Sequence, residues 1–245
     1  MFMLLGCLSL YAADNDLITR QITITLEKAG TLPDRIASSK KNKITNLKII
    51  GEINGTDLRM IREMAGSNSN GNSTDGKLSV LDLSEAKIVK GGDCYLNNGY
   101  DYTSNDVIGS RAFLGCSGLT SLTLPAGITE IGSYAFRGCS GLTSIYVYAE
   151  KVPKIGWDVF VGVDAKKCTV YVPMGTRDDY CASDFGDYFE NIVEFEATGI
   201  DKTTTSTDVE EVVRYSVNGQ RLSAPTKGLN IVKYSDGSVK KVAVR

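Results

Sequence analysis

The sequence predicts an α/β solenoid, a fold in which repeated units stack and each unit adds one strand to a parallel sheet. Two observations predict it. The stretches that begin at Ile108 and Ile131 agree at 12 of their first 14 positions, which gives a period of 23 residues. Each copy also ends in alternating apolar positions, the pattern of a strand with one buried face. Because one repeat cannot bury its own apolar side, stacked copies are needed to form a continuous core.

Each copy divides into the same three parts. The first part, IGSRAF or IGSYAF, predicts a short helix or turn with its apolar residues on one side, and the glycine-rich GCSG then turns the chain. The third part, LTSLTL or LTSIYV, is the predicted strand. The residues expected to face the core are Ile108, Ala112, Phe113, Leu119, Leu122 and Leu124 in the first copy, and Ile131, Ala135, Phe136, Leu142, Ile145 and Val147 in the second.

Degenerate copies flank these two. Downstream, residues 155–173 keep the Ile-Gly pair, Phe160 and a final Val-Tyr-Val strand. Upstream, residues 78–88 and 44–51 carry leucine and isoleucine in the same spacing. A period in this range is typical of leucine-rich repeats.

The repeats are expected to lie between two other parts. In the first, residues 22–26 alternate as a strand, and Leu58, Ile61, Met64 and Ala65 have helical spacing behind an expected N-cap at Thr56. In the last, Asn218-Gly219 and Asp236-Gly237 predict hairpin turns. The predicted fold is thus a short leucine-rich repeat array with an N-terminal α/β cap and a small C-terminal all-β module. The expected segments are 1–13 (signal), 14–75 (cap with a first degenerate repeat), 76–197 (repeats), 198–211 (linker) and 212–245 (β module).

The first 13 residues predict export. This apolar run is shorter than the roughly 20 residues that span a bilayer, and it ends in small residues as signal peptides do, without their usual positive start. Within it, the LLGC stretch also fits a bacterial lipobox, in which Cys7 would carry the lipid. We expect an exported protein without a transmembrane span, located at the cell surface, associated with the outer membrane or secreted. Lipid anchoring and free secretion both stay open.

The composition argues against several kinds of chemistry. The chain has no histidine, so it has no Ser-His-Asp triad, Cys-His pair or imidazole metal ligand. Its net charge of −2 gives no reason to expect a nucleic-acid partner. The cysteines after Cys7 lack CxxC spacing: Cys116 and Cys139 are expected to be buried apolar fillers, and a Cys168–Cys181 disulfide is the alternative for the last pair. We predict no catalytic, metal-binding or cofactor-binding residues.

The repeated unit resembles the BspA-like, Treponema-type leucine-rich repeats of bacterial surface proteins. The resemblance covers residues 78–173 and rests on Ile-Gly, Ala-Phe, Gly-Cys and Leu-x-x-Leu-x-Leu at the family's spacing. It implies export by Bacteroidetes or other mucosal bacteria, and a role in adhesion to host matrix, other bacteria or epithelial cells. The tail, residues 217–245, resembles the C-terminal β modules that Bacteroidetes attach to exported proteins; whether it is cleaved stays open.

Two surfaces are candidate partner-binding sites. The first is the exposed side of the repeat strands, where equivalent residues should form rows about 4.8 Å apart; its candidates are Asp82, Thr123, Tyr146, Tyr148 and Tyr171. The second is an 18-residue insertion between the strand at Leu83 and the strand at Leu124, with Tyr95, Tyr100 and Tyr102 beside acidic residues. Tyrosines there could stack on sugar rings or anchor a peptide. In both places, ordinary surface or loop residues without a ligand are the alternative explanation.

The favoured function is an exported, non-enzymatic binding or adhesion protein whose partner is a protein or glycan at the bacterial surface. One alternative is a structural surface component that binds copies of itself. The least favoured alternative is a glycan-acting enzyme with Asp82, Asp93 or Asp101 as acid and base. No spacing in the sequence favours a particular carboxylate pair.

Overall fold

The computed structural model describes residues 16–196, 211–216, 221–222, 224, 228–234 and 239–244. The chain divides into two compact units, Met1–Thr198 and Gly199–Arg245. The expected signal segment, with Cys7, lies outside the described residues, and so does the expected linker apart from Glu211, which begins a strand.

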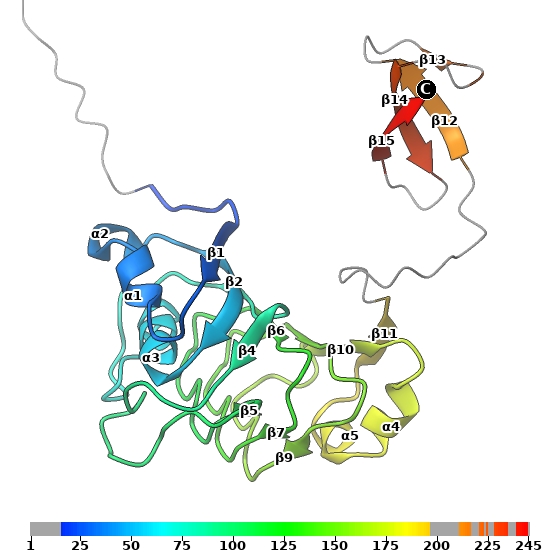
Figure 1. Cartoon of the computed structure of the whole chain (residues 1–245). Helices are drawn as coiled ribbons and strands as arrows, with labels where there is room; N and C mark the ends of the chain where they lie inside the picture. The colour runs from blue at the N-terminus through cyan, green and yellow to red at the C-terminus, as the bar shows by residue number, and fades with distance from the viewer. Residues whose placement is uncertain are drawn as a thin grey trace, which may run out of the picture. The chain divides into compact units, whose positions relative to one another are not determined.

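The larger unit is built on one parallel sheet of eight strands (Figure 1). Seven strands lie side by side in the order β1-β2-β3-β6-β8-β10-β11, and β4 pairs with the far end of β2. Their bounds are β1 Ile22–Leu26, β2 Asn46–Ile53, β3 Val80–Asp82, β4 Ala86–Ile88, β6 Ser121–Leu124, β8 Ser144–Val147, β10 Thr169–Pro173 and β11 Ile192–Phe195. Successive repeats pair in register, so each side chain has its equivalent directly beside it. The predicted α/β solenoid of parallel strands is thereby confirmed.

A second, narrow parallel sheet lines the opposite side of the stack. Its strands are β5 Val107–Ile108, β7 Glu130–Ile131 and β9 Lys154–Ile155. The predicted short helix or turn is therefore a two-residue strand followed by a turn. The glycine after each isoleucine is required by close packing, since a Cβ at Gly132 would lie 2.6 Å from the backbone nitrogen of Ser110.

Phenylalanines form a continuous column inside the stack. Phe113 and Phe136 stack with their ring centroids 5.4 Å apart, and Phe136 and Phe160 with theirs 5.5 Å apart. Backbone hydrogen bonds run beside the rings, from the Phe113 N–H to the Ala135 carbonyl and from the Phe136 N–H to the Val159 carbonyl. These contacts confirm the expected core positions and explain why the phenylalanine recurs in every unit.

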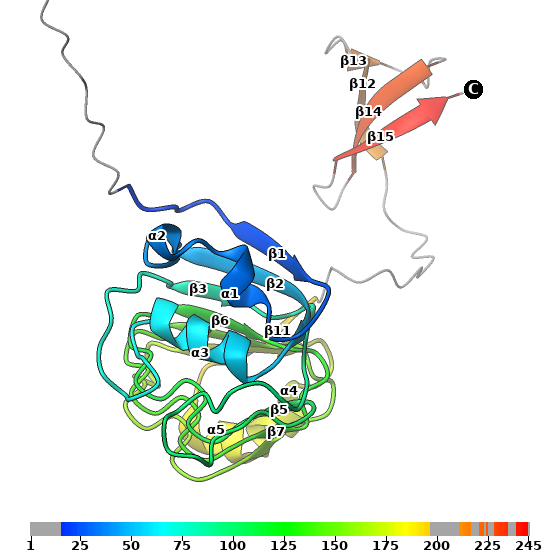
Figure 2. The same ribbon diagram turned by 60° about the vertical axis from the view of Figure 1, so that its left-hand side comes forward.

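The N-terminal end of the stack carries β1, β2 and three helices, drawn in blue and cyan in Figures 1 and 2. The helices are α1 Leu32–Arg35, α2 Ser38–Lys41 and α3 Gly55–Met64. The α3 residues predicted from helical spacing are buried. The expected N-cap at Thr56 is wrong: Asn54 caps α3 in a capping box with Asp57, because the Asn54 oxygen accepts from the Thr56 N–H and Asp57 accepts from the Asn54 N–H.

Helix α3 is tied to the first repeat by a buried arginine. The Arg62 side chain is fully buried, and its guanidinium donates to the carbonyls of Ala112 (2.9 Å), Arg111 (3.0 Å) and Leu114 (3.2 Å). Carbonyl oxygens thus take the place of a carboxylate partner. Where the cap ends and the repeats begin stays a prediction, because β2 of the cap continues the same sheet as β3.

Two short helices close the other end of the stack and were not predicted. They are α4 Arg177–Cys181 and α5 Asp184–Tyr188, drawn in yellow in Figure 1. The Phe185 and Phe189 rings pack against Phe160 at centroid distances of 6.0 and 4.8 Å, so they continue the phenylalanine column. The Tyr180 hydroxyl, also buried, donates to the Ala149 carbonyl at 2.7 Å.

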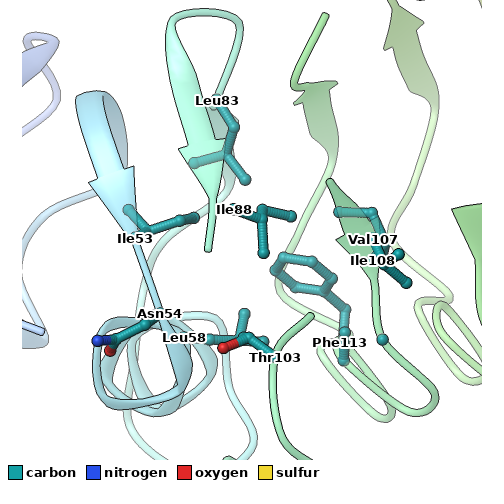
Figure 3. A pocket seen from close by; sticks show the side chains of 11 residues that line it. Ile53, Asn54, Leu58, Leu83, Ile88, Thr103, Val107, Ile108 and Phe113 are labelled. Carbon is teal, nitrogen blue, oxygen red and sulfur yellow. The ribbon is translucent and has the colours of Figure 1, made fainter. Parts of the chain in front are cut away.

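The insertion between β4 and β5 packs against α3 and the first repeat. A small apolar cavity of about 10 Å³ remains under it, lined by hydrocarbon side chains apart from Asn54 and Thr103 (Figure 3). That volume holds about one water molecule at most. The cavity is thus a packing gap in the core and offers no room for a ligand.

The smaller unit contains four antiparallel strands in the order β13-β12-β14-β15. Their bounds are β12 Glu211–Ser216, β13 Arg221–Leu222, β14 Gly228–Tyr234 and β15 Val239–Val244. The strands flank the two dipeptides predicted to form hairpin turns. Asn218-Gly219 and Asp236-Gly237 themselves lie outside the described residues.

The described cysteines are all free thiols, so the alternative of a Cys168–Cys181 disulfide is wrong. Cys116 and Cys139 are fully buried, as expected for apolar fillers. Burial raises the pKa of the Cys116 thiol to about 12 and that of the Cys139 thiol well above its usual value. Cys181, by contrast, is exposed on α4.

Candidate functional site

One row of outward-facing residues crosses the whole large sheet. We call it the central row; it lies on the face of the sheet that points away from the core, hereafter the exposed face. Backbone register places its members side by side on seven successive strands. They are Thr23, Lys48, Asp82, Thr123, Tyr146, Tyr171 and Val193. Four of the five residues predicted for this surface therefore stand in one line, and Tyr148 lies one residue beyond the end of β8.

The half of the central row nearer the C-terminal end is aromatic. The rings of Tyr146 and Tyr171 stack at a centroid distance of 4.4 Å and an interplanar angle of 9°. Phe195 on β11 stands edge-on to Tyr146 at 5.7 Å and to Tyr148 at 4.9 Å. All four side chains are partly exposed. The result is an aromatic cluster held in fixed geometry on rigid strands, which is the arrangement that lets tyrosine contribute contact area at low entropic cost.

The other half of the central row is charged. The Lys48 ammonium lies 2.6 Å from the Glu85 carboxylate and 3.4 Å from the Asp82 carboxylate. The hydrogen bond to Glu85, together with the charges of both carboxylates, raises the pKa of Lys48. The other Asp82 oxygen accepts from the Ser84 N–H at 2.9 Å. Two carboxylates therefore share one ammonium, which gives this half a small negative charge.

Tyr148 links the two halves electrostatically. Burial, followed by the nearby Asp82 carboxylate, raises the pKa of the Tyr148 hydroxyl, and the Lys48 ammonium partly opposes this. Burial also raises the pKa of Tyr146, with smaller effects from Tyr171 and Tyr148. Both hydroxyls are therefore neutral at physiological pH and can donate or accept hydrogen bonds.

The insertion supplies a less organised surface. Tyr100 is 86% exposed and Tyr102 is 51% exposed, so both are available to a partner. The expectation for Tyr95 is wrong, because its ring is 1% exposed and its hydroxyl donates to the Ser110 carbonyl at 2.7 Å. Tyr95 thus holds the insertion against the first repeat.

The carboxylates named for an enzyme are bound to different parts of the fold. Asp82 pairs with Lys48 on the exposed face, whereas Asp101 is buried and bonds to Arg111 at 3.2 Å. Asp93 bonds to the Thr56 hydroxyl at the start of α3. Within the part of the chain that the structure describes, no three acidic or cysteine side chains gather as metal ligands would.

Lys48 and Phe195 are among the site residues that the sequence reasoning missed. Lys48 belongs to the central row because β2 pairs with β3, and Phe195 completes the aromatic cluster because β11 adds a strand beyond β10. The alternation in residues 192–195 is a signal for that strand, but only the register shows which tyrosines its phenylalanine meets.

Taken together, the stacked units, parallel sheet and outward row define a leucine-rich repeat solenoid. Residues 106–192 match the family described as "BspA type Leucine rich repeat region (6 copies)". Such repeats are generally binding modules without catalysis and are typical of adhesion proteins at the cell surface. The search of curated proteins found no match for this chain. The longest described helix, α3, has ten residues, so none of the helices in that part of the chain could cross a membrane.

Proposed function

We propose that this protein is an exported, non-enzymatic binding or adhesion protein, and that the exposed face of its repeat sheet contacts a protein or glycan at the surface of bacterial or host cells. The observation that carries this proposal is the central row. Stacked, partly exposed tyrosines stand beside a cluster of charged groups on a sheet whose backbone is fixed by repeat-to-repeat hydrogen bonds.

The aromatic half supplies the features of a binding hot spot. Tyrosine is enriched among the few residues that dominate binding energies, and the Tyr146 and Tyr171 rings are already ordered by their contact with each other and with Phe195. Binding of a partner therefore costs little side-chain conformational entropy at these two tyrosines. The charged half supplies hydrogen-bonding groups that set orientation.

The export part of the proposal rests on the apolar segment 1–13 and on the family of the repeats. Fractionation of the source cells, with mass spectrometry of both ends of the mature protein, tests it. A mature chain that begins after residue 13, or that carries lipid on Cys7, supports export. A full-length chain confined to the cytoplasm contradicts it.

The binding part is tested with the full chain on an array of glycans, matrix proteins and mucin. We expect reproducible binding to at least one member. If nothing on the array binds the folded chain, the adhesion proposal is wrong.

A second candidate function is self-assembly, which the ends of the large sheet favour. Within the described residues, β1 and β11 each pair along one edge alone, and β1 has the β-prone sequence ITITL. Light scattering over a concentration series decides: a mass that grows with concentration supports assembly, and a constant monomer mass contradicts it.

A further inference from the structure

The central row passes from charged to aromatic side chains at one small residue, Thr123. Thr123 on β6 stands between Asp82 of β3 and Tyr146 of β8, and the three are direct neighbours in register. The equivalent position in the next two units is a tyrosine, so Thr123 is where the aromatic stack stops. The short threonine side chain leaves its neighbours' side chains accessible above it.

One face of the Tyr146 ring is directed toward this place. Tyr171 covers the other face, since the two rings are nearly parallel at 4.4 Å. That distance is close to the spacing of adjacent strands, about 4.8 Å, so the ring planes stand roughly perpendicular to the direction of the row. The face of Tyr146 that Tyr171 does not cover therefore points along the row toward β6 and Thr123.

Hydrogen-bonding groups surround the same place. The Asp82 carboxylate lies on the far side of Thr123 from Tyr146, and its side chain keeps 21% of its surface exposed although it contacts Lys48 and Ser84. Thr123 itself, which carries a hydroxyl, lies between Asp82 and Tyr146. The Tyr148 hydroxyl lies within electrostatic range of Asp82 and Lys48, since the carboxylate raises its pKa and the ammonium lowers it.

We propose that the space above Thr123 binds one pyranose ring of a neutral glycan, with the sugar's C–H face against Tyr146 and its hydroxyls bonded to Asp82, Thr123 and Tyr148. This inference rests on the proposed binding function and names the ligand class at that same face. A pyranose is the ligand with this pair of properties, an apolar face and a rim of hydroxyls that both donate and accept.

Charge favours a neutral sugar over an acidic one. Asp82 and Glu85 share the single ammonium of Lys48, so the local charge is slightly negative. An anionic sugar or sulfate would be repelled, whereas sugar hydroxyls can donate to a carboxylate in a charge-assisted hydrogen bond. The strand edges of β3, β6 and β8 are all paired within the sheet, so a peptide cannot bind here as an added strand.

The decisive variant is Thr123→Tyr. It places on β6 the residue that β8 and β10 already carry at the same position, so the sheet accepts it, and the new ring covers the free face of Tyr146. The control is Trp157→Ala, which removes a ring that is 80% exposed and follows β9 in the narrow sheet, outside both candidate surfaces. A second variant, Asp82→Asn, keeps the shape and removes the charged acceptor. Far-UV circular dichroism and the urea midpoint report whether each variant is folded.

The probes are tetrasaccharides of glucose, galactose, mannose and N-acetylglucosamine, titrated into the full chain by isothermal calorimetry and saturation-transfer NMR. We expect at least one to bind, and its affinity to fall by about tenfold or more in Thr123→Tyr and Asp82→Asn. Trp157→Ala should bind as the wild type does.

Three results would overturn the inference. The first is that none of the four sugars binds; the second is that Thr123→Tyr binds the sugar unchanged. The third is that an acidic sugar such as a sialyl oligosaccharide is preferred. If the array of matrix proteins instead yields a protein partner whose binding Thr123→Tyr leaves intact or strengthens, the glycan inference fails while the proposed binding function stands.

Discussion

Replacing Phe136 with alanine tests the stacked core. The ring is fully buried, with Phe113 on one face and Phe160 on the other. Removing a buried phenylalanine costs about 3–5 kcal/mol, and each aromatic pair adds roughly 0.5–1.5 kcal/mol beyond burial. Because Phe136 forms two such pairs in the middle of the column, we expect the upper part of that range, about 4–5 kcal/mol.

Urea unfolding followed by far-UV circular dichroism measures this effect. Phe136→Leu keeps most of the apolar volume and loses the ring contacts, so it should cost about 1–2 kcal/mol. Trp157→Ala, at a side chain that is 80% exposed, is the surface control and should stay within about 0.5 kcal/mol of the wild type. A loss below about 1 kcal/mol for Phe136→Ala would refute the stacking scheme.

Three further predictions concern the cap and the thiols. Arg62→Met should destabilise the larger unit by about 2–4 kcal/mol in the same urea assay, because it leaves several buried carbonyls without donors. An unchanged midpoint would contradict the role of Arg62 in joining α3 to the first repeat. Asn54→Ala should cost about 1–2 kcal/mol through loss of the helix cap, and a cost near zero would mean that Asp57 caps α3 alone. Burial raises the pKa values of the Cys116 and Cys139 thiols well above 8, so at pH 8 both thiols are neutral as well as buried. Iodoacetamide should therefore label the exposed Cys181 first, and should label Cys116 and Cys139 only in urea. Mass spectrometry of the labelled peptides checks this order, and equal labelling in native buffer would contradict it.

Local repetition made the repeats predictable. Residues such as Phe113 and Phe136 recur at a fixed spacing, so each copy confirms the role of the other, and their burial followed from the pattern. The ends of the stack carry no such second copy. Helices α4 and α5 have five residues each, too few for helical periodicity to show, and they are held in place by Phe185 packing on the column.

The candidate site was predictable only as a set of positions. Strand alternation indicated that Asp82, Thr123, Tyr146 and Tyr171 face outward, and the register between strands then placed them in a single row. Tyr95 shows where this reasoning fails. A tyrosine in an insertion has no periodic partner, so the sequence does not distinguish a ring that packs inward from exposed neighbours such as Tyr100.

The central claim is that the exposed face of the sheet, through its central row, binds the partner. It is tested most directly by comparing two double variants against the tightest ligand from the array. We predict that Tyr146→Ala/Tyr171→Ala weakens binding by roughly thirtyfold or more, the loss expected from removing hot-spot residues. Tyr100→Ala/Tyr102→Ala removes two tyrosine rings from the insertion instead and should bind as the wild type does. Circular dichroism checks that both double variants are folded. If the insertion variant loses binding while the sheet variant keeps it, the partner binds elsewhere and the claim is wrong.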